Sequence, residues 1–191
     1  SSGKMGFAIA EALSNQGAQV TLVSGPSALQ NTNPDIKLIK VTSALEMMEA
    51  CENAFPTVNI TVMAAAVADY RPRVTADSKI KREKKGAFSI DLIPNPDIIK
   101  TLGSAKTDGQ YLLGFALETN NAEENAKKKI ISKNLDAIVL NSLEDKGAGF
   151  GVDTNKISII DSDNKITRFE LKSKADVASD IVDFIITRTS K

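Results

Sequence analysis

The chain has 191 residues, of which 42% are hydrophobic and 25% are charged, and these values are ordinary for one globular α/β domain. Its 24 basic and 24 acidic side chains give no formal net charge, so bulk charge argues for neither nucleic-acid nor membrane binding. The sequence has no histidine, which excludes Ser-His-Asp and Cys-His catalysis, and its only cysteine, Cys51, excludes an internal disulfide and fits a reducing cytoplasm.

A small-residue turn opens the chain, with the sequence Ser-Ser-Gly-Lys-Met-Gly, and an amphipathic helix over residues 5–16 follows at once. Small residues let backbone amides approach an anion, and a helix N-terminus adds its positive dipole end. The candidate phosphate-binding residues are therefore Ser1, Ser2, Gly3 and Gly6, with a plain terminal turn as the alternative. A turn of this kind normally follows a strand, so we expect that the first strand and the residues upstream of it are missing from this chain.

Strands and helices alternate through the rest of the chain. Strands are predicted over residues 19–23, 36–41, 58–67, 88–93, 111–116 and 136–140, and a hairpin over 157–160 and 166–171. Helices are predicted over residues 43–54, from about 97, over 121–134 and over 173–188. This order predicts an α/β fold with a Rossmann-like, open, mostly parallel sheet, helices on both faces and a late antiparallel hairpin.

Polar residues follow the predicted strands at their carboxyl ends, at Ser24, Asp69, Glu118 and Asn141. Ligands of open α/β sheets bind at that edge. Before Asp69 stand three alanines at 64–66, which leave room for a flat ligand on the backbone, although Asp69 could also be a simple turn residue in a polar loop over 68–72.

Because the sequence has no histidine, lysines are the candidate cationic groups of a site. A basic segment covers residues 79–86, and Lys129 and Lys133 share one face of a predicted helix because they are four residues apart. Such lysines are most often solvated. Together they could instead supply the positive charge that a triphosphate needs, so an enzyme built here would use Lys, Asp, backbone dipoles and Mg²⁺ for phosphoryl or nucleotidyl transfer.

Six short motifs occur in order along nearly the whole chain: Ser-Ser-Gly-Lys-Met-Gly at 1–6, Ala-Ala-Val-Ala-Asp-Tyr at 65–70, Lys-Ile-Lys at 79–81, Asn-Pro-Asp-Ile at 95–98, Gly-Phe-Ala-Leu-Glu-Thr at 114–119 and Lys-Asn-Leu-Asp at 133–136. Each motif is weak alone, but six in register are specific. Together they resemble the bacterial phosphopantothenate–cysteine ligases, which form the ligase domain of bifunctional coenzyme A biosynthesis flavoproteins.

The resemblance implies a CTP-dependent ligation in two steps. CTP and the carboxylate of 4′-phosphopantothenate form an acyl-cytidylate and release pyrophosphate, with Mg²⁺ as the cofactor. The amine of L-cysteine then attacks, giving phosphopantothenoylcysteine and CMP. The whole chain, residues 1–191, would be one ligase domain.

The resemblance also implies roles for individual residues. The backbone of Met63, Ala64 and Ala65 would line the nucleotide site and Asp69 would contact the nucleotide. Lys79 would be catalytic, reaching the α-phosphate and the acyl-phosphate transition state. The cytosine edge would be read by Pro96, Asp97, Ile98 and Ile99. Phe115 would pack against the nucleotide, and Lys129 and Lys133 would hold the triphosphate. The metal ligands stay unknown.

The family is dimeric and often carries a flavin-dependent decarboxylase domain before the ligase, so we expect a homodimer and a fused or associated decarboxylase, in the cytoplasm, with no nucleic-acid or membrane partner. This chain departs from the family in lacking that domain and the Asn that precedes the Ser-Ser pair. Two alternatives are a nicotinamide-dependent reductase and a non-enzymatic nucleotide-binding module. Ser24-Gly25-Pro26 argues against the first, because NAD enzymes carry an acidic residue there.

Overall fold

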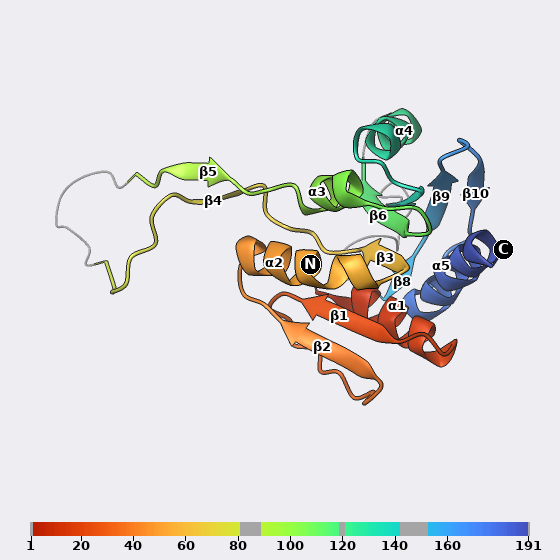
Figure 1. Ribbon diagram of the computed structural model, residues 1–191, viewed down its shortest axis with the longest axis horizontal. Helices are drawn as coiled ribbons and strands as arrows, with labels where there is room; N and C mark the ends of the chain where they lie inside the picture. The colour runs from red at the N-terminus through yellow and green to blue at the C-terminus, as the bar shows by residue number, and fades with distance from the viewer. Residues whose placement is uncertain (1, 81–88, 119–120, 142–152, 191) are drawn as a thin grey trace.

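A five-stranded mixed sheet forms the centre of the computed structural model, which describes residues 2–80, 89–118, 121–141 and 153–190. The strand order is β10–β9–β7–β6–β3, with β3 at Ile60–Met63, β6 at Tyr111–Leu117, β7 at Ala137–Asn141, β9 at Ile157–Asp161 and β10 at Ile166–Arg168 (Figure 1). β3, β6 and β7 run parallel, whereas β9 and β10 pair antiparallel. The predicted late antiparallel hairpin is confirmed as the β9–β10 edge, and these two strands beside three parallel ones make the sheet mixed and not mostly parallel.

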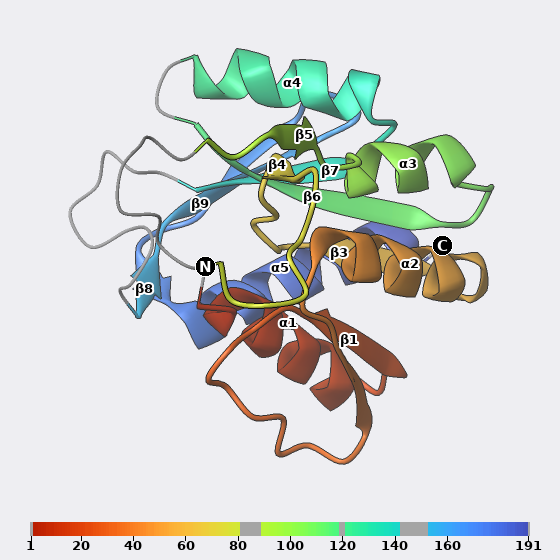
Figure 2. The same cartoon turned by 90° about the vertical axis from the view of Figure 1, so that its left-hand side faces the viewer.

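Helices cover both faces of the sheet, as predicted (Figure 2). One face is covered by α2 (Ala44–Ala54), α3 (Ile98–Ala105) and α4 (Ala122–Ser132), and the other by α1 (Lys4–Asn15) and α5 (Lys174–Thr189). Alternation along the strands feeds both cores: Ile138 and Leu140 pack toward the first group, and Ala137 and Val139 toward the second. The buried sheet thus fixes the carboxyl ends of its parallel strands.

A separate parallel pair, β1 (Val20–Ser24) and β2 (Ile36–Lys40), lies beside α1 and α2 (Figure 1). Among the described residues, no hydrogen-bonded pairing joins this pair to the five-stranded sheet. The 3-10 helix η1 at Phe55–Thr57 ends α2, and a small antiparallel pair joins β8 (Thr154–Asn155) to β11 (Lys172–Ser173). The prediction of a further strand before Ser1 stays a prediction.

A two-stranded arm extends away from the body (Figure 1). It consists of β4 (Tyr70–Pro72) paired antiparallel with β5 (Leu92–Pro94), together with the described residues 73–80 and 89–91 that flank them. The polar loop predicted over 68–72 was therefore wrong in part, and the strand predicted over 58–67 ends at Met63. Within the described ranges, no helix is long and apolar enough to cross a membrane.

Candidate functional site

The carboxyl ends of β3, β6 and β7 meet at one edge of the sheet, because the three strands are parallel. Met63 ends β3 beside Gly114 of β6, and Leu117 of β6 lies beside Asn141, which ends β7. Ala64 and Ala65 follow Met63 without regular structure. This is the edge at which the sequence predicted a ligand site, and it is bordered by the N-terminus of α3 and the face of α4.

A hydrogen-bonded crossing ties the segment after β3 to the segment before α3. The Asn95 amide donates to the Asp69 carbonyl (2.8 Å), and the Asn95 side chain donates to the Ala68 carbonyl (2.8 Å). Arg71 completes the crossing by donating to the Pro94 carbonyl (2.7 Å) and to the Asn95 side chain (3.1 Å). Two predicted site segments, around Asp69 and around Pro96, are therefore held side by side.

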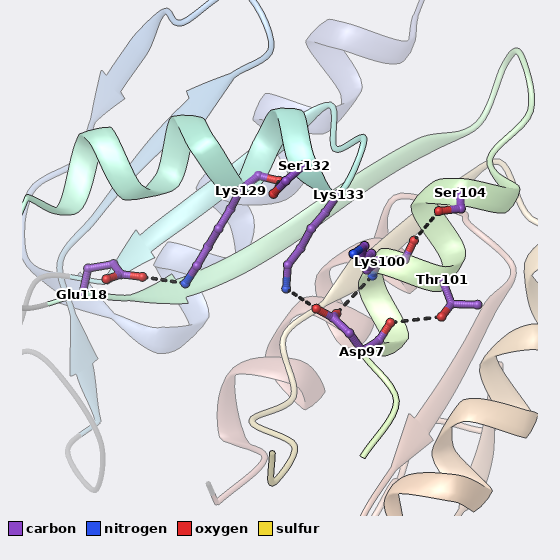
Figure 3. Close-up of polar contacts among 8 residues, drawn as sticks. All are labelled: Asp97, Lys100, Thr101, Ser104, Glu118, Lys129, Ser132 and Lys133. Carbon is purple, nitrogen blue, oxygen red and sulfur yellow. Dashed lines mark hydrogen bonds and ion pairs between the residues drawn. The ribbon is translucent and has the colours of Figure 1, made fainter. Parts of the chain in front are cut away.

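Asp97 links α3 to α4 through its two carboxylate oxygens (Figure 3). Oδ1 accepts from the Lys100 amide at 3.2 Å and so caps the first turn of α3. Oδ2 lies 2.8 Å from the Lys133 ammonium. Thr101 adds a side-chain hydrogen bond to the Asp97 carbonyl (3.1 Å). One carboxylate thus both starts a helix and fixes a cation predicted to hold phosphate.

The backbone at Lys133 rests directly on α3. A Cβ added at Gly103 would lie 1.8 Å from the Lys133 carbonyl oxygen, so only glycine fits at this position. Asn134 follows with a positive φ of 52° and donates from its side chain to the Gly103 carbonyl at 2.8 Å. The start of the Lys133 side chain is therefore set by a backbone-to-backbone contact between α3 and the end of α4.

Lys129 is held by Glu118 in the same way that Lys133 is held by Asp97 (Figure 3). Its ammonium lies 2.5 Å from Glu118 Oε1, and the Asn125 side chain donates to Glu118 Oε2 at 3.2 Å. Glu118 follows the last residue of β6, and Lys129 lies in the last turn of α4. The two lysines extend from one face of α4 toward the sheet edge and the N-terminus of α3.

Both carboxylates are ionised at neutral pH. The hydrogen bond from Lys129 lowers the pKa of Glu118, with a smaller contribution from Asn125. Burial opposes ionisation of Asp97, but the hydrogen bonds from Lys133 and the Lys100 amide, together with the charges of both lysines, outweigh it and lower the pKa of Asp97. The site therefore contains two lysine–carboxylate ion pairs at neutral pH.

The apolar residues predicted to contact the nucleotide differ in how far they are buried. Ile98 is only 4% exposed and belongs to the core, so its backbone alone is available to a ligand. Ile99 is partly buried against the same core, and Phe115 and Ala64 are partly buried on the opposite face of the sheet, against the α1 and α5 side. Contact between these residues and a nucleotide stays a prediction.

The N-terminal turn has the geometry of an uncapped helix start. Gly3 precedes α1 with φ 81°, no side chain caps the helix, and its first turn carries no acidic residue. The Ser27 hydroxyl donates to the Ser2 carbonyl at 2.9 Å, which holds the turn against the loop after β1. Ser1 lies outside the described residues. Phosphate binding by Ser2, Gly3 and Gly6 stays a prediction.

Lys79 lies on the arm, apart from the α3–α4 pairs. The chain runs outward from β4, with the Arg73 amide donating to the Asp91 carbonyl at 2.8 Å, and Lys79 is exposed further along it. Most of the predicted basic segment, residues 81–86, lies outside the described residues. The structure therefore joins the Asp69 and Pro96 segments and pairs Asp97 with Lys133, one helical turn after Lys129, and it leaves the catalytic role of Lys79 a prediction.

The sequence did not predict that Asp97, assigned to the cytosine edge, and Glu118 form ion pairs with the two lysines. Glu118 was noticed only as a polar residue after a strand, while Asn125 and Gly103 were not singled out. The spacing of Asn125 and Lys129, four apart on one helix, is a signal that both could reach a common partner. The close approach of Gly103 to Lys133 has no signal in the sequence, because it joins segments 30 residues apart (133 less 103).

A family model matches residues 1–188, the model of the DNA/pantothenate metabolism flavoprotein C-terminal domain. The chain is 52% identical over 187 residues to a cysteine/cysteine sulfinic acid decarboxylase of an unknown prokaryotic organism, covering 98% of this chain and 52% of that protein. It is 41% identical over 185 residues to the coenzyme A biosynthesis bifunctional protein CoaBC of Bacillus subtilis (strain 168), covering 97% of this chain and 45% of that protein. The chain thus spans about half the length of these curated relatives.

A solved structure shares the fold. The crystal structure of the C-terminal domain of a coenzyme A biosynthesis bifunctional protein CoaBC has a TM-score of 0.82 and 38% sequence identity, and the match covers 100% of this chain and 84% of that one. The mixed sheet and its flanking helices are therefore the architecture of that C-terminal domain.

Proposed function

Because the chain belongs to the DNA/pantothenate metabolism flavoprotein C-terminal domain family, we propose that it catalyses the CTP-dependent ligation of 4′-phosphopantothenate to L-cysteine. The observation that carries the proposal is the family match over residues 1–188, supported by two ion-paired lysines near the carboxyl ends of the parallel strands. Each curated relative extends well beyond the matched segment, so the decarboxylation named for one of them is not carried over.

The chemistry suits the residues. A carboxylate oxygen of 4′-phosphopantothenate attacks the α-phosphorus of CTP, the bond to pyrophosphate breaks, and an acyl-cytidylate forms. The cysteine amine then attacks the acyl carbon, loses a proton, and expels CMP. Negative charge develops on the departing pyrophosphate, and ammonium groups stabilise it. Lys129 and Lys133 would bind the β- and γ-phosphates, and Lys79 would stabilise the charge at the α-phosphorus.

Cytosine recognition would use backbone groups near Ala65 and at residues 96–99. The Asn95 crossing holds those two segments together, which supports a shared role in binding one base. Cytosine presents an exocyclic amino donor where uracil presents an acceptor. A site of backbone carbonyls therefore favours CTP over UTP, because the wrong base leaves buried groups unpaired.

Mg²⁺ would enter with the nucleotide. Among the residues that the structure describes, no group of three or more His, Cys, Asp or Glu side chains is placed to hold a metal. This fits an ion that takes most of its ligands from phosphate oxygens and water, as Mg²⁺ does in nucleotide sites. The ion would neutralise phosphate charge that the two lysines leave uncompensated.

The family also supports a homodimer, and a flavin-dependent decarboxylase domain fused to or associated with the ligase would use its product. A cytoplasmic location belongs to the same proposal. Analytical sedimentation of the purified protein tests this proposal. A homodimer should have twice the monomer mass of 20.4 kDa.

A thermal-shift panel and a product assay test the function. CTP with Mg²⁺ should raise the melting temperature more than UTP, ATP, NAD or NADP at equal concentration, and the full reaction mixture should yield phosphopantothenoylcysteine and pyrophosphate in equal amounts. Equal stabilisation by CTP and UTP would overturn the cytosine assignment. Selective stabilisation by NAD or NADP would instead support the reductase.

A further inference from the structure

Lys129 is engaged by a carboxylate that is itself fixed in place. Glu118 accepts from Lys129 through Oε1 at 2.5 Å and from Asn125 through Oε2 at 3.2 Å. The Glu118 side chain is 18% exposed and that of Lys129 is 40% exposed. The carboxylate is therefore the more buried and better anchored member of the pair, and the ammonium, on a flexible stem, is the member that can move.

The pair joins two different elements and is not a local helix contact. The residues are 11 apart in sequence, with Glu118 after β6 and Lys129 on α4. The anchor for Glu118, Asn125, lies one helical turn before Lys129 on the same helix. Glu118 thus places negative charge directly against the Lys129 ammonium, the group proposed to bind phosphate.

We propose that Glu118 is a counter-ion that competes with the nucleotide phosphates for Lys129 and so limits how tightly the site holds CTP and the departing pyrophosphate. This inference rests on the proposed function. An ammonium shared between a carboxylate and a phosphate contributes less to phosphate binding than a free one, so the carboxylate acts through Lys129. Because pyrophosphate leaves before the amide bond forms, a partly neutralised lysine favours its release.

The test is the affinity of the protein for CTP and for pyrophosphate, each with Mg²⁺, by isothermal titration. Glu118→Gln keeps the shape of the side chain and removes its charge. We expect both ligands to bind about two- to fivefold more tightly, the range set by a partly exposed ion pair. Pyrophosphate should become a correspondingly stronger product inhibitor. Damage to the fold would weaken binding, so tighter binding separates this role from a structural one.

The matched control is Glu123→Gln on α4, the helix that carries Lys129. Glu123 also forms an ion pair, 2.6 Å from Arg168, and its removal makes the same change in net charge. We expect no change in either affinity. In a Lys129→Met background, Glu118→Gln should have no further effect, because the carboxylate acts through that lysine.

Unchanged or weaker binding in Glu118→Gln would overturn the inference, and so would equal tightening in Glu123→Gln. An effect of Glu118→Gln that persists without Lys129 would also overturn it. These outcomes leave the proposed function standing, provided that the wild-type protein binds CTP. Absence of both CTP and pyrophosphate binding in the wild-type protein would overturn the proposed function, and the inference with it.

Discussion

The α3–α4 side of the candidate site and the β4–β5 arm differ in how they are held. On the α3–α4 side, Asp97, Lys133, Glu118 and Lys129 are connected by ion pairs, a helix cap and a backbone contact to elements packed on the sheet. The arm is two short strands paired with each other, and its apolar side chains at Tyr70, Val74 and Leu92 are exposed at 60%, 78% and 56%. The two lysines proposed to bind phosphate are thus each held by an ion pair, whereas the proposed catalytic lysine is carried on the less constrained element.

This difference in how the two regions are held suits the proposed tasks of phosphate binding and catalysis. Lysines that bind a triphosphate benefit from a backbone already held in place, because less conformational entropy is lost on binding. A catalytic group that must close over an unstable acyl-cytidylate has to approach and withdraw. The comparison predicts that changes on the α3–α4 side alter stability and affinity together, whereas changes on the arm alter turnover alone.

Gly103→Ala is the change that should break the α3–α4 side most severely. Its Cβ would lie 1.8 Å from the Lys133 carbonyl oxygen, which is backbone and cannot move aside without separating α3 from the end of α4. We expect a loss of about 3 kcal/mol or more in the free energy of unfolding, the upper end for overpacking. Urea denaturation measures it. Ser104→Ala is the control on the same helix, since its exposed hydroxyl only donates to the Lys100 carbonyl. Equal stability of the two variants would contradict the contact.

The sequence alone predicts local features of the fold and the candidate site better than contacts between distant segments. Signals for helix starts are local, so the helix predicted over 43–54 and the helix predicted from about 97 both begin within one residue of α2 and α3. The hairpin of β9 and β10 was found from its turn. Pairing between distant segments has no local signal, and so the β4–β5 arm and the separation of the β1–β2 pair from the main sheet were not predicted. The lysines were found as cations, but their carboxylate partners come from separate elements and needed the fold.

Lys79→Gln tests whether a change on the arm alters turnover alone. Stabilisation of charge developing at the α-phosphorus is a transition-state effect, so kcat should fall on the order of 10²-fold while the dissociation constant for CTP changes little. Steady-state kinetics and titration of the same variant measure the two quantities. Lys37→Gln on β2, which is exposed and distant from the sheet edge, makes the same change in charge and should leave kcat intact. Near-normal turnover in Lys79→Gln at saturating CTP would show that Lys79 is only a surface lysine.

Substitutions of Asp97 should have a smaller effect. Two different substitutions separate its role as a helix cap from its ion pair with Lys133. Asp97→Asn retains a capping oxygen and loses the ion pair with Lys133, whereas Asp97→Ala loses both. We expect Ala to cost about 1 kcal/mol more than Asn in the free energy of unfolding. Because the pKa of Asp97 is lowered in the folded protein, its ionic contribution is complete above the unfolded value of about 4 and is lost as the pH falls through the folded value. The stability difference between wild type and Asn should therefore vanish in acid, and a difference independent of pH would contradict the ion pair.

Gly6→Ala should have the smallest effect on the fold, which makes it the cleanest probe of the N-terminal turn. A Cβ at Gly6 meets no atom within 4 Å, and the residue is helical, so the variant should be as stable as wild type or up to about 1 kcal/mol more stable. Gly17, after the same helix, has φ 85°, and Gly17→Ala should destabilise by about 1 kcal/mol. If the turn binds phosphate through its backbone, the methyl group at Gly6 stands where the ligand approaches, and affinity for 4′-phosphopantothenate or CTP should fall without any loss of stability. Affinities equal to wild type for both ligands would mean that Gly6 is an ordinary helix residue and that this turn holds no phosphate.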